Sequence, residues 1–323
     1  MSASLSAVSK MDTADVEVLA RLRDSVASVF HGTPELIDHL LVAVLAGGHV
    51  LIEDVPGVGK STLAQALATA LGCSFTRLQF TADLLPSDII GVNVYDNSKG
   101  EFQFHPGPVF CNVLLADEIN RTPPKTQSSL LEAMNEAQVS VDGRLHPLPQ
   151  PFLVLATQNP FESHGTFPLP ESQVDRFLVR LQIGYPELEN ERLLLREAGR
   201  EVPAAEQILD PESVVALQQR AMAVSLHPTI EDFILAILRA TRTTPGLALG
   251  ASPRAGQALV AASRARAFLA SRDFVAPDDV LAVVEPVLAH RLLPAPSPES
   301  GARGSRSSVA ILREILAGIP VPR

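Results

Sequence analysis

The stretch HVLIEDVPGVGKSTLAQALATAL, residues 49–71, constrains the fold of this chain more than any other. An apolar run ends at Asp54, a turn with two glycines follows, and Lys60, Ser61 and Thr62 open a helical pattern. A strand, a tight loop and a helix start direct several backbone N–H groups at one point, and the helix N-terminus also attracts an anion there. The stretch therefore predicts a phosphate-binding loop between a buried strand and a helix.

The loop departs from the pattern G-x-x-x-x-G-K-[ST] at one position, where Asp54 replaces the first glycine. That residue closes the strand in most such loops and does not contact phosphate, so the replacement removes no donor. Gly57 and Gly59 let the backbone come close to a ligand, because they have no Cβ. Lys60 can reach the β- and γ-phosphates of a nucleotide, and Ser61 can be a ligand of Mg²⁺.

A second motif, NVLLADEIN, is an apolar run that ends in two adjacent acids, Asp117 and Glu118. In an enzyme that hydrolyses nucleoside triphosphates, Asp117 would hold Mg²⁺ through water, and Glu118 would orient and polarise the attacking water. An acid pair at the end of a strand is by itself often a solvated edge. An acid pair that follows a phosphate loop in the sequence indicates a hydrolytic site.

Three further residues are candidates for the same site, each with an ordinary alternative. Asn159 follows the run LVLATQ and could bond the water or the γ-phosphate, or only start a turn before a proline. Arg176 follows a short helical pattern and could reach the γ-phosphate of a neighbouring subunit, or be a surface arginine. Arg254 lies in the first turn of a helix, where the dipole does not favour a cation, which indicates an anion nearby.

The first half of the chain predicts a three-layer α/β domain with a parallel sheet, because apolar runs alternate with helical patterns. Most of these runs are apolar on both faces, as buried parallel strands are. A helix is expected over 13–30, and Thr33 is expected to cap a second helix that starts at Pro34. The expected strands are 49–54, 75–80, 112–117, 151–159 and 177–183.

Two segments predict β-hairpins in addition to this scheme, 92–105 and 138–148. The second has Asp142-Gly143 between alternating arms, a strong signature of a tight hairpin. Either hairpin could be surface decoration or have a working role. From residue 188 onward we expect only helices and a polar linker. The expected helices are 211–224, 228–243, 253–271 and 277–290, followed by the linker 294–308 and a last helix at 309–319.

Composition weighs against several classes of protein. The formal net charge is −10, whereas a general nucleic-acid binder usually has a basic balance. No apolar stretch approaches the length of a membrane span, and the first residues have no apolar signal-peptide core. Cys73 and Cys111 form no CxxC motif, so we expect reduced thiols and a cytoplasmic chain. The eight histidines form no zinc motif, so the expected metal is the Mg²⁺ of the nucleotide.

These motifs, in this order, resemble those of the AAA+ ATPases. Their detailed sequences resemble the MoxR family, close to the magnesium-chelatase-like branch. The resemblance covers about residues 30–290, and the tail after 291 is not matched. In that family the letters EDVPG before the lysine are an ordinary variant. The stretches that resemble the family are GGHVLIEDVPGVGKS, LQFTADLLPSDIIG, FHPGPVFCNVLLADEINRTPPKTQSSLLEAMNEAQVSVDG, ATQNPFESHGTFPLPESQVDRFLV and GASPRAGQAL.

The resemblance implies a P-loop AAA+ core with hairpin inserts over 1–187 and a small all-α lid, with the linker and last helix, over 188–323. It also implies ATP and Mg²⁺ as ligands, with Ser61 and Asp117 on the metal. The implied residues are Pro56, Gly57, Val58, Gly59, Lys60, Ser61 and Thr62 of Walker A, Asp117 and Glu118 of Walker B, Asn159 as sensor 1, Arg176 as arginine finger, Arg254 as sensor 2, and Gly32 with Phe30 and His31 beside adenine.

The resemblance implies that ATP is hydrolysed between subunits of a ring, expected to be a hexamer. The implied role is chaperone-like remodelling of partner proteins or metal insertion into them, together with a protein that has a von Willebrand factor A domain. A motor subunit of a metal chelatase remains an alternative, as does a nucleic-acid motor, although the acidic balance weighs against it. A monomeric P-loop kinase and a non-hydrolysing scaffold fit less well, the scaffold because Lys60, Asp117 and Glu118 are all present.

Overall fold

The structure is a computed structural model and describes residues 13–160, 165–197, 203–296 and 307–322. It divides into two compact units, which are described separately below. The first unit is Leu22–Ala216, and the second is made of Met1–Arg21 and Leu217–Arg323, within the described residues. The core and lid boundary expected after residue 187 stays a prediction.

The first unit contains a parallel sheet of five strands in the order β2-β5-β8-β1-β9. The three inner strands are almost wholly buried, which explains their continuous apolar runs. This order places the end of β1 beside the end of β8, and the end of β5 next to that. All five expected strands are confirmed, each shorter than expected and β9 less than half as long: β1 Val50–Glu53, β2 Phe75–Gln79, β5 Val113–Asp117, β8 Leu153–Gln158 and β9 Val179–Leu181.

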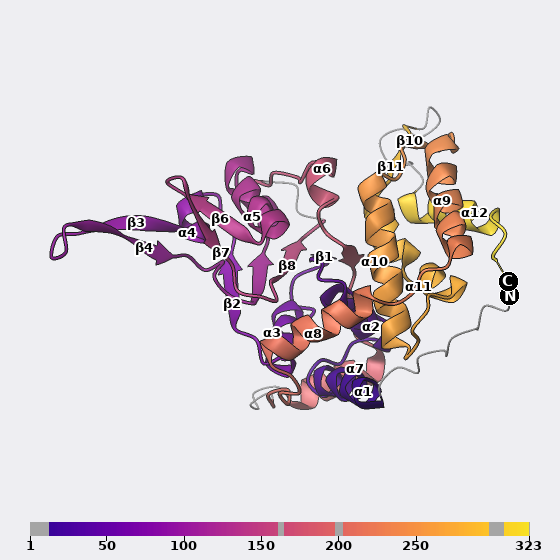
Figure 1. Cartoon of the computed structure of the whole chain (residues 1–323), viewed down its shortest axis with the longest axis horizontal. Coiled ribbons are helices and arrows are strands. Elements are labelled where there is room, and N and C mark those ends of the chain that lie inside the picture. Colours follow the sequence, from indigo (N-terminus) through magenta and orange to yellow (C-terminus); the bar gives the residue numbers. More distant parts are fainter. Residues whose placement is uncertain (1–12, 161–164, 198–202, 297–306, 323) are drawn as a thin grey trace, which may run out of the picture. The chain divides into compact units, whose positions relative to one another are not determined.

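Helices flank this sheet (Figure 1). The side chain of Thr33 accepts the N–H of Leu36, so the predicted cap of the second helix is confirmed. The first helix ends at Ala27, short of the expected residue 30, and the N–H groups of Val29 and Phe30 both donate to the carbonyl of Val26 in the turn that follows. The helices in this part of the chain are α1 Thr13–Ala27, α2 Pro34–Leu45, α3 Lys60–Ala70, α4 Pro86–Ile90, α5 Pro124–Glu136, α6 Glu171–Val174, α7 Leu188–Glu197 and α8 Pro211–Met222, with a short 3-10 turn at Ile119–Arg121.

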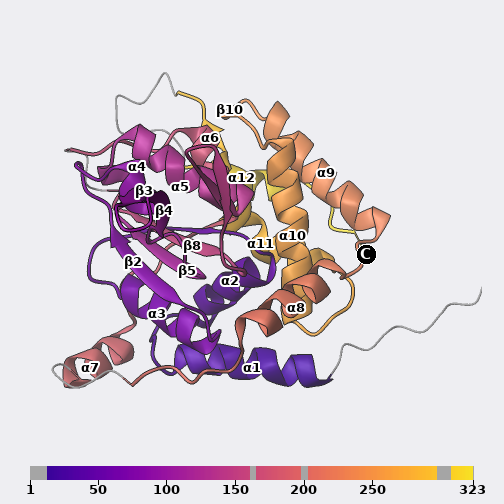
Figure 2. The same cartoon turned by 60° about the vertical axis from the view of Figure 1, so that its left-hand side comes forward.

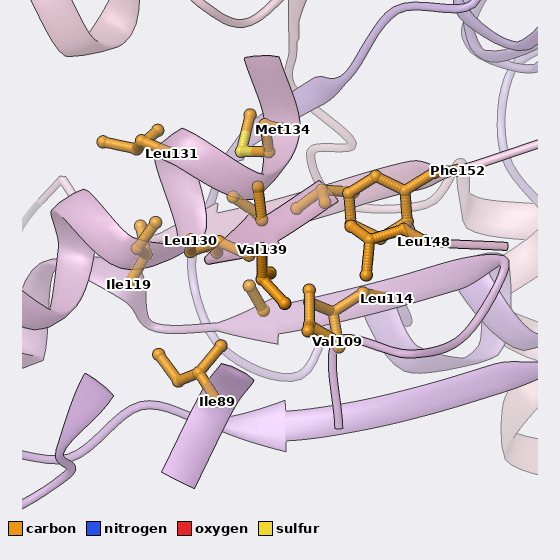
Figure 3. Close-up of a cluster of buried hydrophobic side chains, with 14 of the residues drawn as sticks. Ile89, Val109, Leu114, Ile119, Leu130, Leu131, Met134, Val139, Leu148 and Phe152 are labelled. Atoms are coloured by element: carbon orange, nitrogen blue, oxygen red, sulfur yellow. The ribbon is translucent and has the colours of Figure 1, made fainter. Parts of the chain in front are cut away.

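A buried apolar cluster of the first unit joins α5 to the sheet. Leu130 and Met134 of α5 lie with Leu114 of β5 in this cluster, and Val139 and Phe152 also belong to it (Figure 3). All of these side chains are at least nine-tenths buried. The cluster holds α5 in place. It thereby positions the segment between β5 and β8, the two strands at whose ends candidate site residues lie.

Both predicted hairpins are present. The strands β3 Gly91–Asp96 and β4 Glu101–Pro106 form one hairpin, which extends away from the sheet (Figure 1). The strands β6 Gln138–Val141 and β7 Arg144–Pro147 form the other. At its turn, residues 142 and 143 have φ of 48° and 77°, as the Asp-Gly signature requires.

The second unit is mainly helical, with α10 beside α11 (Figure 2). One expectation is wrong here, because this half of the chain also holds a small antiparallel pair, β10 Leu247–Leu249 with β11 Leu293–Pro294. Strands of three and two residues are too short to show an alternating pattern, and the proline further hides the second. The main helices are α9 Pro228–Thr243, α10 Pro253–Leu269, α11 Pro277–Leu288 and α12 Ser308–Ala317.

The expected linker 294–308 is therefore shorter than predicted at both ends. Pro294 belongs to β11, and Ser308 already belongs to α12. Residues 297–306 lie outside the described residues. Among the helices that the structure describes, none combines the length and the apolar character needed to cross a bilayer.

Candidate functional site

The predicted phosphate loop connects β1 to α3 and is shaped by two glycines. Gly57 and Gly59 have φ of 88° and 90°, a conformation that side chains with a Cβ rarely adopt. Gly59 also occupies the N-cap of α3, and no side chain caps this helix. The first N–H groups of α3 therefore remain available for an anion, as expected for a phosphate-binding helix start.

A cavity of about 330 Å³ lies over this loop and over the carboxyl ends of the neighbouring strands. The structure thus brings together nine residues that the sequence singled out and adds two that it did not, Arg77 and Gln79. The lining residues are Pro56, Gly57, Gly59, Lys60, Ser61, Thr62, Arg77, Gln79, Asp117, Glu118 and Asn159.

Lys60 is held at the mouth of the loop. Its Nζ donates to the backbone carbonyl of Asp54 at 2.6 Å. Burial lowers the pKa of Lys60 from its ordinary value, while the negative charges of Asp54, Asp117 and Glu118 act in the opposite direction. The lysine therefore lies among the negative groups of the site, where a triphosphate would supply further negative charge.

Asp54 has a structural role that the sequence did not reveal. Its side chain is buried, and Oδ2 accepts the backbone N–H groups of Ile183 and Gly184, each at 2.6 Å. Its Oδ1 accepts the N–H of the next residue, Val55, at 2.8 Å. The residue in place of the usual glycine thus joins the start of the loop to the segment after β9. No local signal could have predicted this bond, because its partners are about 130 positions away.

Asp117 ends β5 and has both carboxylate oxygens occupied. The hydroxyl of Thr157, on β8, donates to Oδ1 at 2.6 Å. Nη2 of Arg77, on the edge strand β2, lies 2.7 Å from Oδ2. Neither partner was predicted. The two strands that flank β5, β2 and β8, therefore fix the orientation of the Asp117 carboxylate.

Glu118 follows in a left-handed conformation, with φ of 57°, which is uncommon for a residue other than glycine. Its N–H donates to the hydroxyl of Thr157 at 2.9 Å, which holds the backbone in this conformation. Its Oε2 accepts Nε2 of Gln79 at 2.8 Å and forms an ion pair with Nε of Arg121, also at 2.8 Å. The side chain of Glu118 is thus directed to the cavity and held there by two neighbours.

Six predicted residues do not line this cavity: Phe30, His31, Gly32, Val58, Arg176 and Arg254. Val58 lies in the loop without reaching it. The space beside Gly32 is filled by the ring of Phe30, since a Cβ on Gly32 would lie 2.2 Å from that ring. The ring of Phe30 also lies near Gly59. An aromatic side chain therefore fills the space beside this edge of the phosphate loop.

The two predicted arginines lie elsewhere. Arg176, after α6, donates from Nη1 to the backbone carbonyl of Leu131 at 2.7 Å. It is thus held against α5, and its guanidinium is not part of the cavity lining. Arg254 is exposed and lies in the first turn of α10, in the second unit. Its role as a lid arginine stays a prediction.

The residues of the cavity fit a nucleotide with a divalent metal. The free N–H groups of α3 and the ammonium of Lys60 suit phosphate. The hydroxyl of Ser61 and the carboxylate of Asp117 are oxygen donors of the kind that Mg²⁺ prefers. The volume also lies in the range of small-molecule sites.

Comparisons with known families agree with this geometry. Residues 49–179 match the family model described as an ATPase family associated with various cellular activities (AAA). Residues 239–315 match the model of an AAA lid domain. The first match includes the phosphate loop, both acids, Asn159 and Arg176.

Relatives resemble the chain over most of its length. Chaperone MoxR1 of Mycobacterium tuberculosis is 44% identical over 87% of this chain and 77% of its own. Protein MoxR of Methylorubrum extorquens is 32% identical over 95% of this chain and 96% of its own. A crystal structure of a candidate ATPase from Cytophaga hutchinsonii superposes with a TM-score of 0.87 at 36% identity, and covers 96% of both chains.

Proposed function

Because the chain belongs to the MoxR family of AAA+ ATPases, we propose that it binds ATP with Mg²⁺ in the cavity over the phosphate loop and hydrolyses it. The observation that supports this most strongly is the meeting of Lys60, Asp117 and Glu118 in one cavity. These residues come from two strand ends far apart in the sequence. A solvated acid pair at a sheet edge would have no reason to face a phosphate loop.

Each residue of the cavity has a proposed task. The N–H groups of the loop, from Pro56 to Gly59, and the start of α3 bind the phosphates, and Lys60 neutralises the β- and γ-phosphates. Ser61 and Asp117 hold the metal, with Thr62 beside them. When bound, Mg²⁺ neutralises charge on the phosphate oxygens.

Glu118 is the proposed general base. It orients and polarises the water that attacks the γ-phosphate, and its fixed left-handed backbone keeps the carboxylate in the cavity. Asn159, at the end of the neighbouring strand β8, bonds this water or the γ-phosphate. Because the base is already held in the cavity, little reorganisation precedes the chemical step.

We further propose that the site is completed by a second copy of the chain in a ring, most simply a hexamer. Arg176 lies outside the lining of its own cavity, which is consistent with an arginine that acts on a neighbour. Its bond to Leu131 would have to open for this purpose. Arg254 of the lid would contact the γ-phosphate, and Gly32 would lie beside adenine.

The proposal also covers the partner protein on which the ATPase acts. The two hairpins would pass nucleotide-driven motion to a partner protein, in chaperone-like remodelling or metal insertion, together with a protein that has a von Willebrand factor A domain. Val92, Val94, Tyr95 and Phe102 on the first hairpin are exposed apolar side chains, as a surface that handles proteins requires. The free cysteines are compatible with a cytoplasmic location.

The test separates binding from hydrolysis. Nucleotide binding and ATP turnover are measured for the native chain, Lys60→Ala and Glu118→Gln. We expect Lys60→Ala to lose nucleotide binding, and Glu118→Gln to bind ATP without turning it over. Normal ATP binding by Lys60→Ala would mean that the nucleotide site lies elsewhere. Normal turnover by Glu118→Gln would remove Glu118 from the mechanism.

A further inference from the structure

Arg77 forms an ion pair with the residue proposed to hold the metal. Its Nη2 lies 2.7 Å and its Nε 3.3 Å from Oδ2 of Asp117. The arginine side chain is 52% exposed, whereas that of Asp117 is 15% exposed. An ion pair with one partner this exposed contributes little to fold stability. The contact therefore calls for an explanation other than holding β2 to β5.

The position of Arg77 on its strand directs it to the site. Alternate residues of a strand share a face, so Arg77 and Gln79 point to the same side of β2. They contact the two adjacent acids of β5, Asp117 and Glu118 respectively. Both of them also line the cavity over the phosphate loop. The edge strand thus supplies a cation and an amide to the acid pair.

Both acids of the described cavity are ion-paired without a metal. Arg77 faces Asp117, and Arg121 faces Glu118. The ammonium of Lys60 also lines this cavity. A divalent cation that approached Asp117 in the absence of phosphate would meet Arg77 and Lys60 as like charges. A triphosphate brings the negative charge that offsets this repulsion.

We propose that Arg77 is the resident counter-ion of Asp117 and excludes divalent metal from the nucleotide-free site, so that the metal enters together with the nucleotide. This inference rests on the proposed function, because it takes Asp117 as a metal-holding residue. It assigns Arg77 a positioning role on the metal site, distinct from any contact with the reacting atoms.

The experiment measures Mn²⁺ binding to the nucleotide-free chain by electron paramagnetic resonance of the free ion. We expect Arg77→Gln to bind Mn²⁺ about tenfold more tightly than the native chain, because one positive charge next to the site is removed. Arg77→Lys keeps the charge and should resemble the native chain. Arg192→Gln is the matched control, since Arg192 forms an exposed ion pair on α7. Unchanged or weaker Mn²⁺ binding by Arg77→Gln would overturn the inference.

Two additions locate the effect. The gain should disappear in the double variant Arg77→Gln with Asp117→Asn; a gain that persists would place the ion elsewhere and refute the inference. With saturating ADP, the native chain and Arg77→Gln should bind Mn²⁺ almost equally, and an undiminished difference would contradict entry together with the nucleotide. Failure of the proposed function looks different, because the native chain would then bind no ADP at all.

Discussion

The hydroxyl of Thr157 donates a hydrogen bond of 2.6 Å to Oδ1 of Asp117, from β8 to the neighbouring strand β5. The hydroxyl oxygen of Thr157 also accepts the N–H of Glu118, at 2.9 Å. One buried hydroxyl therefore orients the proposed metal-holding carboxylate and also fixes the backbone of the proposed base. Residues that orient metal-holding groups in this way affect metal affinity and activity without touching the substrate.

Thr157→Val tests this contact. Valine has nearly the same shape but can neither donate nor accept, so Asp117 loses its orienting bond and the N–H of Glu118 loses its acceptor. We expect ATP turnover to fall about 10- to 100-fold, with a higher Mg²⁺ requirement. Thr157→Ser should recover most of the activity. Equal turnover and Mg²⁺ dependence for Thr157→Val and the native chain would show that the hydroxyl has no such role.

Asp54→Gly gives the loop its usual first glycine and should nevertheless harm this protein. It removes a buried carboxylate that accepts the N–H groups of Ile183 and Gly184. We expect the free energy of unfolding to fall by about 2–3 kcal/mol, since the lost bonds involve a charged acceptor and leave part-buried donors without it. Urea unfolding provides the measurement, with the exposed Asp232→Asn as control. A variant as stable as the native chain would contradict the role assigned to Asp54.

His49 predicts a dependence of stability on pH. Burial lowers its pKa from 6.5 to about 4. Its Nε2 contacts the carbonyl of Met134, and its Nδ1 accepts the N–H of Val154, so a second proton on the ring would displace that donor. Since the unfolded chain binds the proton more readily, the contribution of His49 is full above about pH 6.5 and decreases as the pH falls towards 4.

The expected loss across this interval is about 3 kcal/mol, from 1.36 kcal/mol for each unit of pKa difference. Unfolding by urea at pH 7 and pH 5 measures the first part of this loss, about 2 kcal/mol, with His49→Gln as the variant that lacks the titrating group. The native chain should lose more stability than His49→Gln on acidification. An identical pH dependence of the two proteins would mean that the ring of His49 is not buried in its neutral form.

Much of the fold could be predicted because its signals are local. A buried parallel strand leaves a continuous apolar run, as at 112–117, and the Asp142-Gly143 turn requires a conformation that few residue pairs adopt. The pair β10 and β11 could not be predicted. Its strands are too short for a pattern, and they lie more than forty residues apart in the chain.

The candidate site could also be predicted only where its signals are local. Lys60, Asp117 and Glu118 belong to contiguous motifs, whose residues the fold brings into one cavity. Arg77 and Thr157 escaped notice because each meets Asp117 across 40 positions of sequence, from a different neighbouring strand. Only the strand order β2-β5-β8 shows that these two residues flank the acid pair.

The central claim is that hydrolysis needs two copies of the chain, and a mixing experiment tests it most directly. Lys60→Ala has a defective phosphate loop but an intact Arg176, whereas Arg176→Ala has the reverse. Each alone should be nearly inactive, since loss of an arginine finger costs about 10³-fold or more in rate. If sites are shared between subunits, ATP turnover in a mixture of the two variants should rise well above that of either variant alone. A mixture as inactive as its components, or an Arg176→Ala chain with native turnover, would contradict the account.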